Sequence, residues 1–332
     1  MDRVAGELVD GHGRRIDYLR LSVLEQCQMR CFYCHPGRPR QKKANPRLPA
    51  ARVIRLAAAF VGLGVRRVRL TGGEPLLRCD LEEIAAGIST LDGIEEVTLS
   101  TNAELLAPRA AALRTAGVGR VNVSLDSLDR ATFARITGGG CLDRVVAGID
   151  AALAAGLRPV KLNSVVMRGI NDHEIGALLG FAREREVDLR FIETMPIGPA
   201  GADSSRLLVP ADEILAAVRA HCGGELVPLL ERRGGGPARY YRLDDGTTVG
   251  VISAMSRHFC ADCIRVRLSA CGDLQLCLGR PGRVGLGQLL ADGASDLELQ
   301  QAICQAIGDK PYGHDFADPA TAATLEMTAI GG

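Results

Sequence analysis

Between Asp17 and about Thr194 the sequence alternates short β-rich segments with amphipathic, helix-like segments. We expect strands at residues 18–24, 66–72, 96–101, 120–126, 160–166 and 189–194, and helices at 51–64, 103–117 and 141–156 among others. Each of these helix-like segments ends near a glycine, as helix C-termini often do. The alternation predicts a parallel sheet with right-handed crossovers. Six such units are too few for a closed eight-stranded barrel, which typically takes about 250 residues, so we expect an α/β fold with an open, partial (βα)6 barrel over residues 1–198.

The pattern changes from about Pro199 onward. Residues 198–205 (GPAGADSS) are typical of a linker, and residues 210–223 of a helix. Short strands, a second group of cysteines and a helical stretch from about Leu286 to Ile307 follow. We therefore expect a smaller α+β domain at residues 199–332, which closes the TIM-like barrel and ends in a Gly331-Gly332 tail.

Composition narrows the classes of function. A hydrophobic fraction of 47% in 332 residues is enough for a sizeable core, and a net charge of +1 gives no sign of a nucleic-acid or membrane partner. The N-terminus is charged from its second residue, unlike a signal peptide, and no uncharged apolar run approaches the roughly 18 residues of a membrane span. Eleven cysteines without an export signal favour metal or redox chemistry in a reducing cytoplasm over a disulfide framework.

Three cysteines, Cys27, Cys31 and Cys34, follow the first expected strand with C-x3-C-x2-C spacing. A thiolate-bound [4Fe–4S] cluster normally takes four cysteines, so three leave one iron open to a substrate or cofactor. The aromatic Tyr33 between the ligands is placed to shield a cluster or to stack on a planar group. The alternatives are a zinc site with the adjacent His35 as fourth ligand, and chance clustering.

The C-terminal ends of parallel strands carry the active site in barrels and open α/β sheets. Distinctive motifs lie at those ends: Cys27 after the first strand, TGGEP (Thr71–Pro75) after the second, and STN, SLDS and ETMP after the third, fourth and sixth. The glycine pair of TGGEP allows close approach of the backbone to a ligand, although an ordinary βα turn has similar residues. We therefore expect the functional site at this end of the barrel.

A second cysteine group, Cys260, Cys263 and Cys277, again offers three ligands. A second iron–sulfur cluster fits this group, and so does a structural zinc site with Cys271 or His258 as the fourth ligand.

The strand that follows Cys263 carries two arginines. Alternate residues of a strand share a face, so Arg265 and Arg267 lie on the face of Cys263, while the apolar residues between them face the core. A cluster ligand and two guanidinium groups on one surface form an anion site, and arginine suits phosphate oxygens particularly well. An exposed, charged strand is the alternative.

Basic residues recur inside the expected barrel. Only four of the 40 basic residues are lysines, so Lys161 within a strand is notable. Arg67 and Arg69 share a face on the second strand, and Arg20 and Arg190 lie on the first and sixth. If these side chains point into the barrel, a polyanion such as a triphosphate explains them, because unpaired buried charge is costly. Surface arginines are the alternative for any one of them.

Together, the C-x3-C-x2-C and TGGEP motifs resemble those of the radical S-adenosylmethionine (SAM) superfamily. The resemblance implies a [4Fe–4S] cluster, with one iron open to the methionine part of SAM, on Cys27, Cys31 and Cys34. One electron from such a cluster cleaves SAM to methionine and a 5′-deoxyadenosyl radical. The resemblance also implies that Tyr33 and Gly73 contact SAM and that Glu74 lies near its amino group.

Nearly the whole chain is similar to one family of this superfamily, the GTP 3′,8-cyclases, which are lyases of molybdenum-cofactor (molybdopterin) biosynthesis. The similarity rests on LRLSV, RLTGGEPLLR, VNVSLDSLD, VKLNSVVMRGINDHEI, RFIETMPIG, FCADCIRVRLSACGDLQLCL and the final GG. It implies SAM contacts from Ser124 and Met195, and a second [4Fe–4S] cluster, whose open iron receives guanine, on Cys260, Cys263 and Cys277. It implies GTP contacts, with the two arginines of the late strand as the catalytic pair, from Arg20, Arg69, Ser100, Lys161, Arg265, Val266 and Arg267.

The same similarity implies the reaction and its partners. The deoxyadenosyl radical takes the ribose 3′ hydrogen of GTP, and C3′ then joins C8 to give (8S)-3′,8-cyclo-7,8-dihydroguanosine 5′-triphosphate. The family implies an electron donor of flavodoxin or ferredoxin type, transfer of the product to cyclic pyranopterin monophosphate synthase, and a cytoplasmic location without nucleic acid or membrane. A homodimer is compatible with it, and the Gly331-Gly332 tail resembles one that reaches into the active site.

The chain departs from the family pattern at Ala103, where glycine is usual, at Ile264, where asparagine is common, and at Cys271, where aspartate is expected. None of these changes removes a ligand, although Cys271 could compete for the second cluster. Two rival functions stay open: another two-cluster radical SAM enzyme of peptide-modifying type, and a zinc-dependent nucleotide-binding regulator. Small buried side chains are expected for the isolated Cys79, Cys141, Cys222 and Cys304.

Overall fold

The computed structural model describes residues 7–34, 47–197, 201, 204–229, 235–316 and 327. Within them, one sheet contains twelve strands. In chain order these are β1 (Tyr18–Ser22), β2 (Arg67–Thr71), β3 (Glu96–Thr101), β4 (Val118–Ser124), β5 (Lys161–Val166), β6 (Asp188–Glu193), β7 (Val227–Leu229), β8 (Arg239–Arg242), β9 (Thr248–Ile252), β10 (Arg265–Leu268), β11 (Asp273–Gln275) and β12 (Arg283–Gly285).

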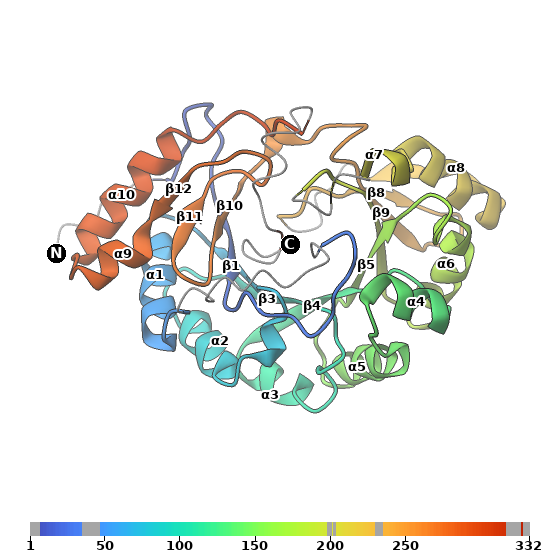
Figure 1. The fold of residues 1–332 in the computed structure, drawn as a ribbon, viewed down its shortest axis with the longest axis horizontal. Coiled ribbons are helices and arrows are strands. Elements are labelled where there is room, and N and C mark those ends of the chain that lie inside the picture. The colour runs from blue at the N-terminus through green and yellow to red at the C-terminus, as the bar shows by residue number, and fades with distance from the viewer. Residues whose placement is uncertain are drawn as a thin grey trace.

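The strand order is β12-β11-β10-β1-β2-β3-β4-β5-β6-β9-β8-β7. Every pairing from β10 through β1 to β9 is parallel. The sheet curves around a central space and its two edges do not pair, so the barrel is open (Figure 1). The α/β class and the partial barrel are therefore confirmed, and all six expected strands occur within two residues of their expected bounds.

The C-terminal strands continue the barrel sheet at both of its edges. β10 pairs in parallel with β1, and β9 pairs in parallel with β6. Antiparallel strands then extend each edge, β11 and β12 beyond β10 and β8 and β7 beyond β9. The smaller C-terminal part thus closes around the barrel from both sides. The expected boundary near residue 198 falls mainly outside the described residues.

Helices cover the outer, convex face of the sheet (Figure 1). The helices described are α1 (Ala50–Gly62), α2 (Leu81–Ser89), α3 (Ala110–Thr115), α4 (Arg130–Thr137), α5 (Leu142–Ala154), α6 (Ile175–Glu184), α7 (Ser204–Leu207), α8 (Ala211–Cys222), α9 (Leu286–Ala291) and α10 (Asp296–Gly308). Helix α10 lies between α9 and α1 in contact with both, and α8 lies beside α6, so the C-terminal part packs against both ends of the helical layer.

Two of the expected helices differ from the structure. The stretch from Leu286 to Ile307 is divided, because the chain turns at Gly293, where φ is +87°, and restarts at a capping box of Ser295 and Glu298. Of residues 103–117 only the end is helical, because the segment begins with Ala103 in a left-handed conformation and passes through Pro108, which cannot donate a helical hydrogen bond.

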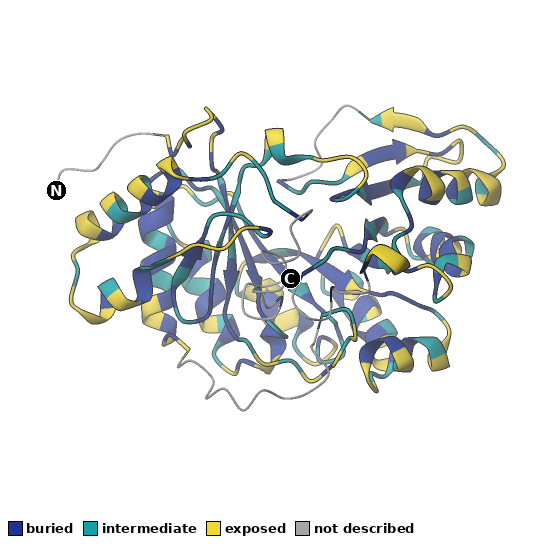
Figure 2. Cartoon of the chain, turned by 45° about the horizontal axis from the view of Figure 1, so that its top comes forward, coloured by how far each residue is buried: buried dark blue, intermediate teal, exposed yellow. Residues whose placement is uncertain are grey.

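The apolar core lies between the sheet and its helices, not inside the barrel. Outward-facing strand residues such as Leu19 and Leu70 pack with helix residues such as Leu56 and Phe60, all of them buried. Figure 2 shows the buried strands and the exposed outer faces of the helices. Most inward-facing strand positions are instead polar, with Val165 and Ile192 as apolar exceptions at the cavity. No helix in the described part of the chain is long and apolar enough to cross a membrane.

Candidate active site

A cavity of about 310 Å³ opens at the C-terminal ends of the barrel strands. Both cysteine groups line it, so residues separated by more than 200 positions in the sequence face one space. Most residues predicted to bind a cofactor or substrate also line it: Arg20, Tyr33, Arg69, Gly73, Glu74, Ser100, Ser124, Met195, Arg265 and Arg267, with Cys27, Cys31, Cys34, Cys260, Cys263 and Cys277. Lys161 and Val266 are not among the lining residues.

The first cysteine group lies on the loop after β1. The backbone N–H groups of Arg30 and Phe32 donate to the carbonyl oxygens of Thr137 and Ile136, at 2.7 and 3.1 Å, which attaches this loop to the end of α4. Burial raises the pKa of the Cys27 thiol to about 11. Thiols held neutral in this way lose their protons to solvent when a metal ion binds the sulfur.

The other two thiols of the group have the same character. Burial raises the pKa of Cys34 to about 12, and burial together with Asp126 raises that of Cys31 well above its usual value. Cys34 and Cys27 add to the raised pKa of Cys31, and Cys27 adds to that of Cys34. The arrangement fits a shared metal centre.

The glycine pair of TGGEP packs against the chain that leads into the cysteine loop. The backbone N–H of Gly73 donates to the carbonyl of Leu24 at 2.6 Å. A Cβ atom on Gly73 would lie 2.3 Å from the carbonyl oxygen of Gln26, and one on Gly72 would lie 2.3 Å from that of Leu24. Both positions therefore exclude a side chain, and this contact sets the position of the cysteine loop.

The carboxylate of Glu74 ties the ends of β2 and β3 together. It accepts hydrogen bonds from the Thr101 hydroxyl at 2.7 Å, the Asn102 backbone N–H at 2.7 Å and the Leu76 backbone N–H at 3.0 Å. Burial outweighs these donors and raises the pKa of Glu74 to about 7. Glu74 is thus both a wall residue of the cavity and a buried acid that titrates near neutrality.

Tyr33 is fixed by a carboxylate from the SLDS motif. Its hydroxyl donates to Oδ2 of Asp126 at 2.7 Å, and Oδ1 of Asp126 accepts the backbone N–H of Val165 at 2.8 Å. Asn171 links the same two segments, because its side-chain amide donates to the carbonyls of Asp126 and Val165. The segment NDHEI therefore supports the SLDS loop and, through Asp126, the aromatic residue between two cysteines.

Three arginines form a row across neighbouring strands. Arg20 on β1 is in register with Arg267 on β10 and with Arg69 on β2. Adjacent strands lie about 4.8 Å apart, and all three side chains line the cavity. Burial, and after it the like charges of Arg267 and Arg69, holds the pKa of Arg20 well below its usual value. Burial also lowers the pKa of Arg69 and of Arg267 to about 10 each. Such a row favours a ligand with several negative charges.

Two predicted basic residues lie deeper in the barrel. Lys161 points inward, but its ammonium group contacts Asp188 at 3.2 Å and the Tyr240 hydroxyl at 3.3 Å. Arg67 pairs with Asp17 at 3.0 Å and does not reach the cavity. These side chains belong to a charge-paired layer beneath the cavity.

Val266 faces the other way. It is fully buried in the apolar core between the sheet and its helices, as the alternation along β10 predicts. Any contact from this residue to a ligand in the barrel comes from its backbone.

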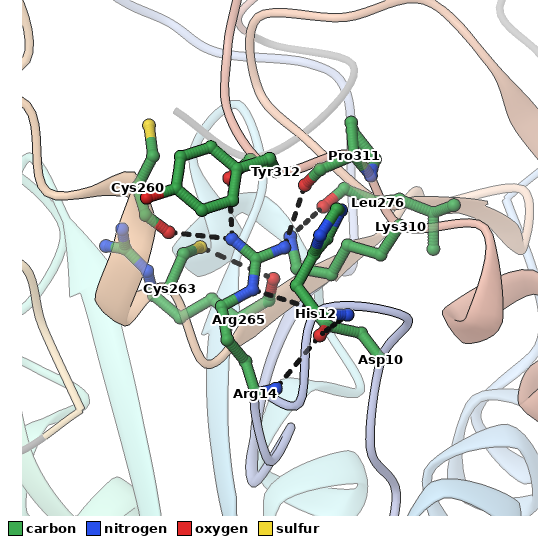
Figure 3. Close-up of polar contacts among 10 residues, drawn as sticks. All are labelled: Asp10, His12, Arg14, Cys260, Cys263, Arg265, Leu276, Lys310, Pro311 and Tyr312. Atoms are coloured by element: carbon green, nitrogen blue, oxygen red, sulfur yellow. Dashed lines mark hydrogen bonds and ion pairs between the residues drawn. The ribbon is translucent and has the colours of Figure 1, made fainter.

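The second cysteine group spans a short 3-10 turn, Cys260–Asp262, and the strands that follow it. Burial acts to raise the pKa of Cys263, but Arg265 and then Lys310 outweigh it and lower that pKa to about 7. Burial raises the pKa of Cys277. The buried ammonium group of Lys310 donates to the carbonyl of Leu276 at 2.7 Å (Figure 3). Its charge interacts with the thiols of Cys263 and Cys277, two of the three in this group.

Arg14 connects the second group to the two ends of the chain. Its guanidinium donates to the carbonyls of Cys260 at 2.7 Å, Tyr312 at 2.6 Å and Pro311 at 2.8 Å, and pairs with Asp10 at 2.7 Å (Figure 3). Arg14 is only 8% exposed. An N-terminal residue therefore sets the position of the turn that carries Cys260.

Neither cysteine triad has its three sulfur atoms as close together as a single zinc ion would hold them. Zn–S bonds of about 2.3 Å place tetrahedral thiolates roughly 3.8 Å apart. Among the described residues, one group of three metal-ligating side chains has its ligand atoms within 4.8 Å of one another, and it is neither cysteine triad. The wider triads fit ligands distributed over the corners of a cluster.

The departures from the family pattern have distinct structural settings. Ala103 adopts φ +63°, which explains why glycine suits that position. Cys271 lies in the turn between β10 and β11, where its sulfur contacts Ser269 at 3.1 Å and Asp273 at 3.4 Å, and it does not line the cavity. Ile264 is half-buried rather than in the core, and its side chain lies near Gly235.

The expectation for the isolated cysteines was wrong in detail. Cys79 is exposed, and the other three are half-buried. Cys222 and Cys304 do pack on the core, whereas Cys141 precedes α5 at its N-cap. Three further predicted residues, His35, Gly331 and Gly332, lie outside the described part of the chain.

Sequence reasoning missed Asp126, Arg14 and Lys310 as supports of the site. Asp126 lies inside the SLDS motif, but the motif alone did not predict that this carboxylate supports Tyr33. The rarity of lysine was a signal for Lys310, which is 2% exposed. Nothing in the sequence distinguishes Arg14 from the exposed Arg15 beside it.

Two family models cover most of the chain. Residues 21–182 match the radical SAM superfamily, and residues 187–316 match the family described as Molybdenum Cofactor Synthesis C. These matches cover β2 to β6, the end of β1 and the part that carries the second cysteine group.

Curated relatives match over nearly their whole length. A GTP 3′,8-cyclase of Hydrogenovibrio crunogenus is 45% identical over 330 residues, covering 98% of this chain and 99% of the relative. One of Pelotomaculum thermopropionicum is 43% identical over 332 residues, covering 97% and 99%. One of Paracoccus denitrificans is 45% identical over 316 residues, covering 93% and 90%.

Among solved structures, Streptococcus suis SuiB bound to S-adenosylmethionine is similar in fold. Its TM-score is 0.61 at 16% identity, with 87% of this chain and 68% of that chain covered. SuiB bound to its precursor peptide SuiA gives the same score and identity, with 91% and 67% covered. At this identity the likeness concerns the fold alone.

Proposed function

Since the chain belongs to the GTP 3′,8-cyclase family of the radical SAM superfamily, we propose that it is a lyase that converts GTP to (8S)-3′,8-cyclo-7,8-dihydroguanosine 5′-triphosphate in molybdenum-cofactor biosynthesis. When bound, the first [4Fe–4S] cluster and SAM supply the 5′-deoxyadenosyl radical that takes the ribose 3′ hydrogen before C3′ joins C8. The observation that carries the proposal is one cavity lined by two cysteine triads and a row of arginines.

The first triad, Cys27, Cys31 and Cys34, holds the first cluster, as the superfamily requires. We assign SAM to the neighbouring wall formed by Tyr33, Gly73, Glu74, Ser124 and Met195, all of which line the cavity. The hydrogen bond from Tyr33 to Asp126 keeps the cysteine loop and the end of β4 at a fixed separation. SAM therefore meets a wall whose parts are already positioned, which reduces the cost of ordering them on binding.

The arginine row takes the triphosphate. Arg20, Arg69 and Arg267 present guanidinium groups side by side, and Arg265 extends the set toward the second triad. Guanidinium groups bind phosphate oxygens through paired N–H donors, which orients the nucleotide as well as attracting it. Ser100 adds a hydroxyl at the end of β3. Lys161 acts from the layer below, and Val266 contributes at most its backbone.

The second triad, Cys260, Cys263 and Cys277, would hold a second [4Fe–4S] cluster, which would bind the guanine of GTP as the family resemblance implies. The pKa of Cys263, lowered to about 7 by Arg265 and Lys310 against the effect of burial, favours a thiolate at that position. Arg265 thus serves two partners, the nucleotide and the cysteine. A zinc centre on the same residues is the competing assignment.

The deciding experiment is anaerobic incubation with GTP, SAM and a reductant. We expect 5′-deoxyadenosine only when GTP is present, together with the cyclised nucleotide. Deoxyadenosine formed at the same rate without GTP would point to another substrate, such as the peptide of a peptide-modifying enzyme. About eight irons per chain are expected for two clusters, and zinc without iron would refute the enzyme assignment.

Replacement of both arginines of β10 tests the substrate. Each charge-assisted hydrogen bond contributes about 1.5–3 kcal/mol, so Arg265→Ala with Arg267→Ala should weaken GTP binding about a hundredfold or more. SAM should still bind at the first cluster, and its cleavage should return when GTP is raised to saturation. Arg242→Ala, at the exposed end of β8, is the matched control and should leave GTP affinity unchanged. Equal GTP affinity in the unchanged protein, the double variant and the control would show that these arginines do not bind GTP.

The partners follow from the same proposal. The chain takes electrons from a donor of flavodoxin or ferredoxin type and passes its product to cyclic pyranopterin monophosphate synthase. Reduction of the purified protein by a candidate donor, followed by EPR, tests the first relation. The proposed homodimer is tested by light scattering, and the proposed boundary between units near residue 198 by limited proteolysis.

A further inference from the structure

Two histidines lie beside Cys260 and take no part in the proposed cluster. Nδ1 of His258 is 3.0 Å from Nε2 of His314. One ring nitrogen of each and the sulfur of Cys260 all lie within 4.8 Å of one another. Within the described ranges, this is the only group of three His, Cys, Asp or Glu side chains whose ligand atoms are so close. Since zinc binds imidazole at about 2.0–2.1 Å and thiolate at about 2.3 Å, shifts of roughly 1 Å let one ion reach all three.

The ring of His314 is held in place and lacks one partner. It stacks on Phe316 with ring centroids 4.1 Å apart, and Nε2 lies 3.0 Å from the carbonyl oxygen of Ala254. A carbonyl only accepts, so the hydrogen lies on Nε2 and a lone pair on Nδ1; Nδ1 is then the ligating nitrogen, and the contact of Nε2 with Nδ1 of His258 is given up when the ion binds. Nδ1 is buried and has no hydrogen-bond partner among the described residues. Metal-bound histidines commonly donate their other N–H to a backbone carbonyl in this way.

We propose that His258, Cys260 and His314 form a site for a single zinc-like divalent cation, which competes with the second cluster for Cys260. One thiolate and two imidazoles are the ligand types that zinc prefers, and water from the cavity fills the fourth position. Binding forms one metal–sulfur and two metal–nitrogen bonds and releases the thiol proton, without electron transfer. A zinc ion and a cluster iron on the same sulfur would crowd and repel each other, so the cation competes with the cluster for Cys260. The competition rests on the proposed function, whereas the cation site does not.

The cation site is tested by zinc titration of a variant that keeps Cys260 and lacks the other five cysteines of the two triads. The full chain carries serine at Cys27, Cys31, Cys34, Cys263 and Cys277, so that Cys260 is the remaining triad cysteine. We expect one zinc per chain, with sulfur and two nitrogens in its X-ray absorption spectrum. His258→Gln and His314→Gln should each weaken zinc binding at least about tenfold. Cys271→Ser is the matched control, since that thiol lies away from the cavity.

Two results would overturn the cation site: zinc affinity unchanged by both histidine replacements, or a spectrum without nitrogen. His258 is exposed, so His258→Gln gives a decisive answer even if replacing His314 disturbs the fold.

Competition is measured on a chain that lacks only the first triad. Iron–sulfur reconstitution without zinc should load about four irons, and one equivalent of zinc should lower that number sharply. In the His258→Gln, His314→Gln double variant, iron loading should resist zinc. Equal loss of iron in both chains would refute competition through the histidines. Failure to load iron even without zinc would instead refute the second cluster, while the titration would still decide the cation site.

Discussion

The guanidinium of Arg14 donates a hydrogen bond of 2.7 Å to the main-chain oxygen of Cys260, a residue 246 positions later in the chain. The same group holds the carbonyls of Pro311 and Tyr312 and pairs with Asp10, whose side chain is fully buried. Three distant segments thus meet at one buried cation. The turn that carries the second cysteine group depends on this cation for its position.

Replacing Arg14 by alanine should destabilise the protein by about 3–5 kcal/mol, because it leaves the Asp10 carboxylate buried without its partner. Three carbonyls also lose their donor, so the second metal centre should lose iron while the first retains it. Denaturant unfolding and iron analysis measure both effects. Arg15→Ala is the control: Arg15 pairs with Glu7 on the surface, where such pairs contribute about 0–1 kcal/mol. Equal effects of the two replacements would contradict the role of Arg14.

Lys310 should raise the reduction potential of the second cluster. Its ammonium group is buried beside Cys263 and Cys277, and a nearby positive charge favours the more negative, reduced form of a cluster. Lys310→Met should therefore lower that potential, and Lys310→Arg should restore part of the difference. An EPR-monitored redox titration measures the change. A potential unaffected by the methionine would show that the charge is screened from the cluster.

Gly73→Ala should disrupt the first metal centre. The added Cβ would meet backbone atoms of Glu25 and Gln26 at 2.3–2.5 Å, so the cysteine loop must move. Overpacking of this kind costs about 1–3 kcal/mol, and iron at the first triad and SAM binding should fall together. Gly180→Ala on α6 is the matched control, since a Cβ there meets nothing within 4 Å. Normal iron content in Gly73→Ala would show that the loop tolerates the shift.

Local patterns were enough to predict the barrel strands. Each of the six carries its own alternation of inward and outward residues, and flanking glycines mark where helices end. The edges of the sheet could not be predicted in this way, because β9 and β10 join β6 and β1 through pairings between distant parts of the chain. No local property of the late strands states which edge each one joins.

The residues inside the barrel also show how far local sequence patterns can predict a structure. The alternation of residues along β2 and β5 correctly predicted that Arg69 and Lys161 point into the barrel. It could not give their depth, which depends on register: Lys161 pairs in register with Asp188, one inward position below Asn163 and Arg190, which line the cavity. A neighbouring carboxylate then satisfies the lysine, whereas Arg69 meets other arginines. Supports such as Arg14 were missed because their partners are backbone carbonyls, which leave no trace in the sequence.

The buried acid Glu74 gives the protein a specific dependence on pH. Its pKa in the folded chain is raised from 4.5 to about 7, chiefly by burial. Between these values the folded chain holds more protons than the unfolded chain, so the free energy of unfolding falls as the pH rises. The contribution is fully present below pH 4.5 and is lost as the pH rises through 7.

Glu74→Gln removes this titration. Between pH 6 and 8, where iron–sulfur proteins can be handled, the free energy of unfolding of the unchanged protein should fall by roughly 1 kcal/mol relative to the variant. Anaerobic denaturant unfolding at pH 6, 7 and 8 measures the difference. The variant should be less stable at every pH, because an amide oxygen replaces only part of a carboxylate that accepts from Thr101, Asn102 and Leu76. Since that loss is independent of pH, the slope alone reports the titration, and a constant difference would mean that Glu74 is already ionised at pH 6.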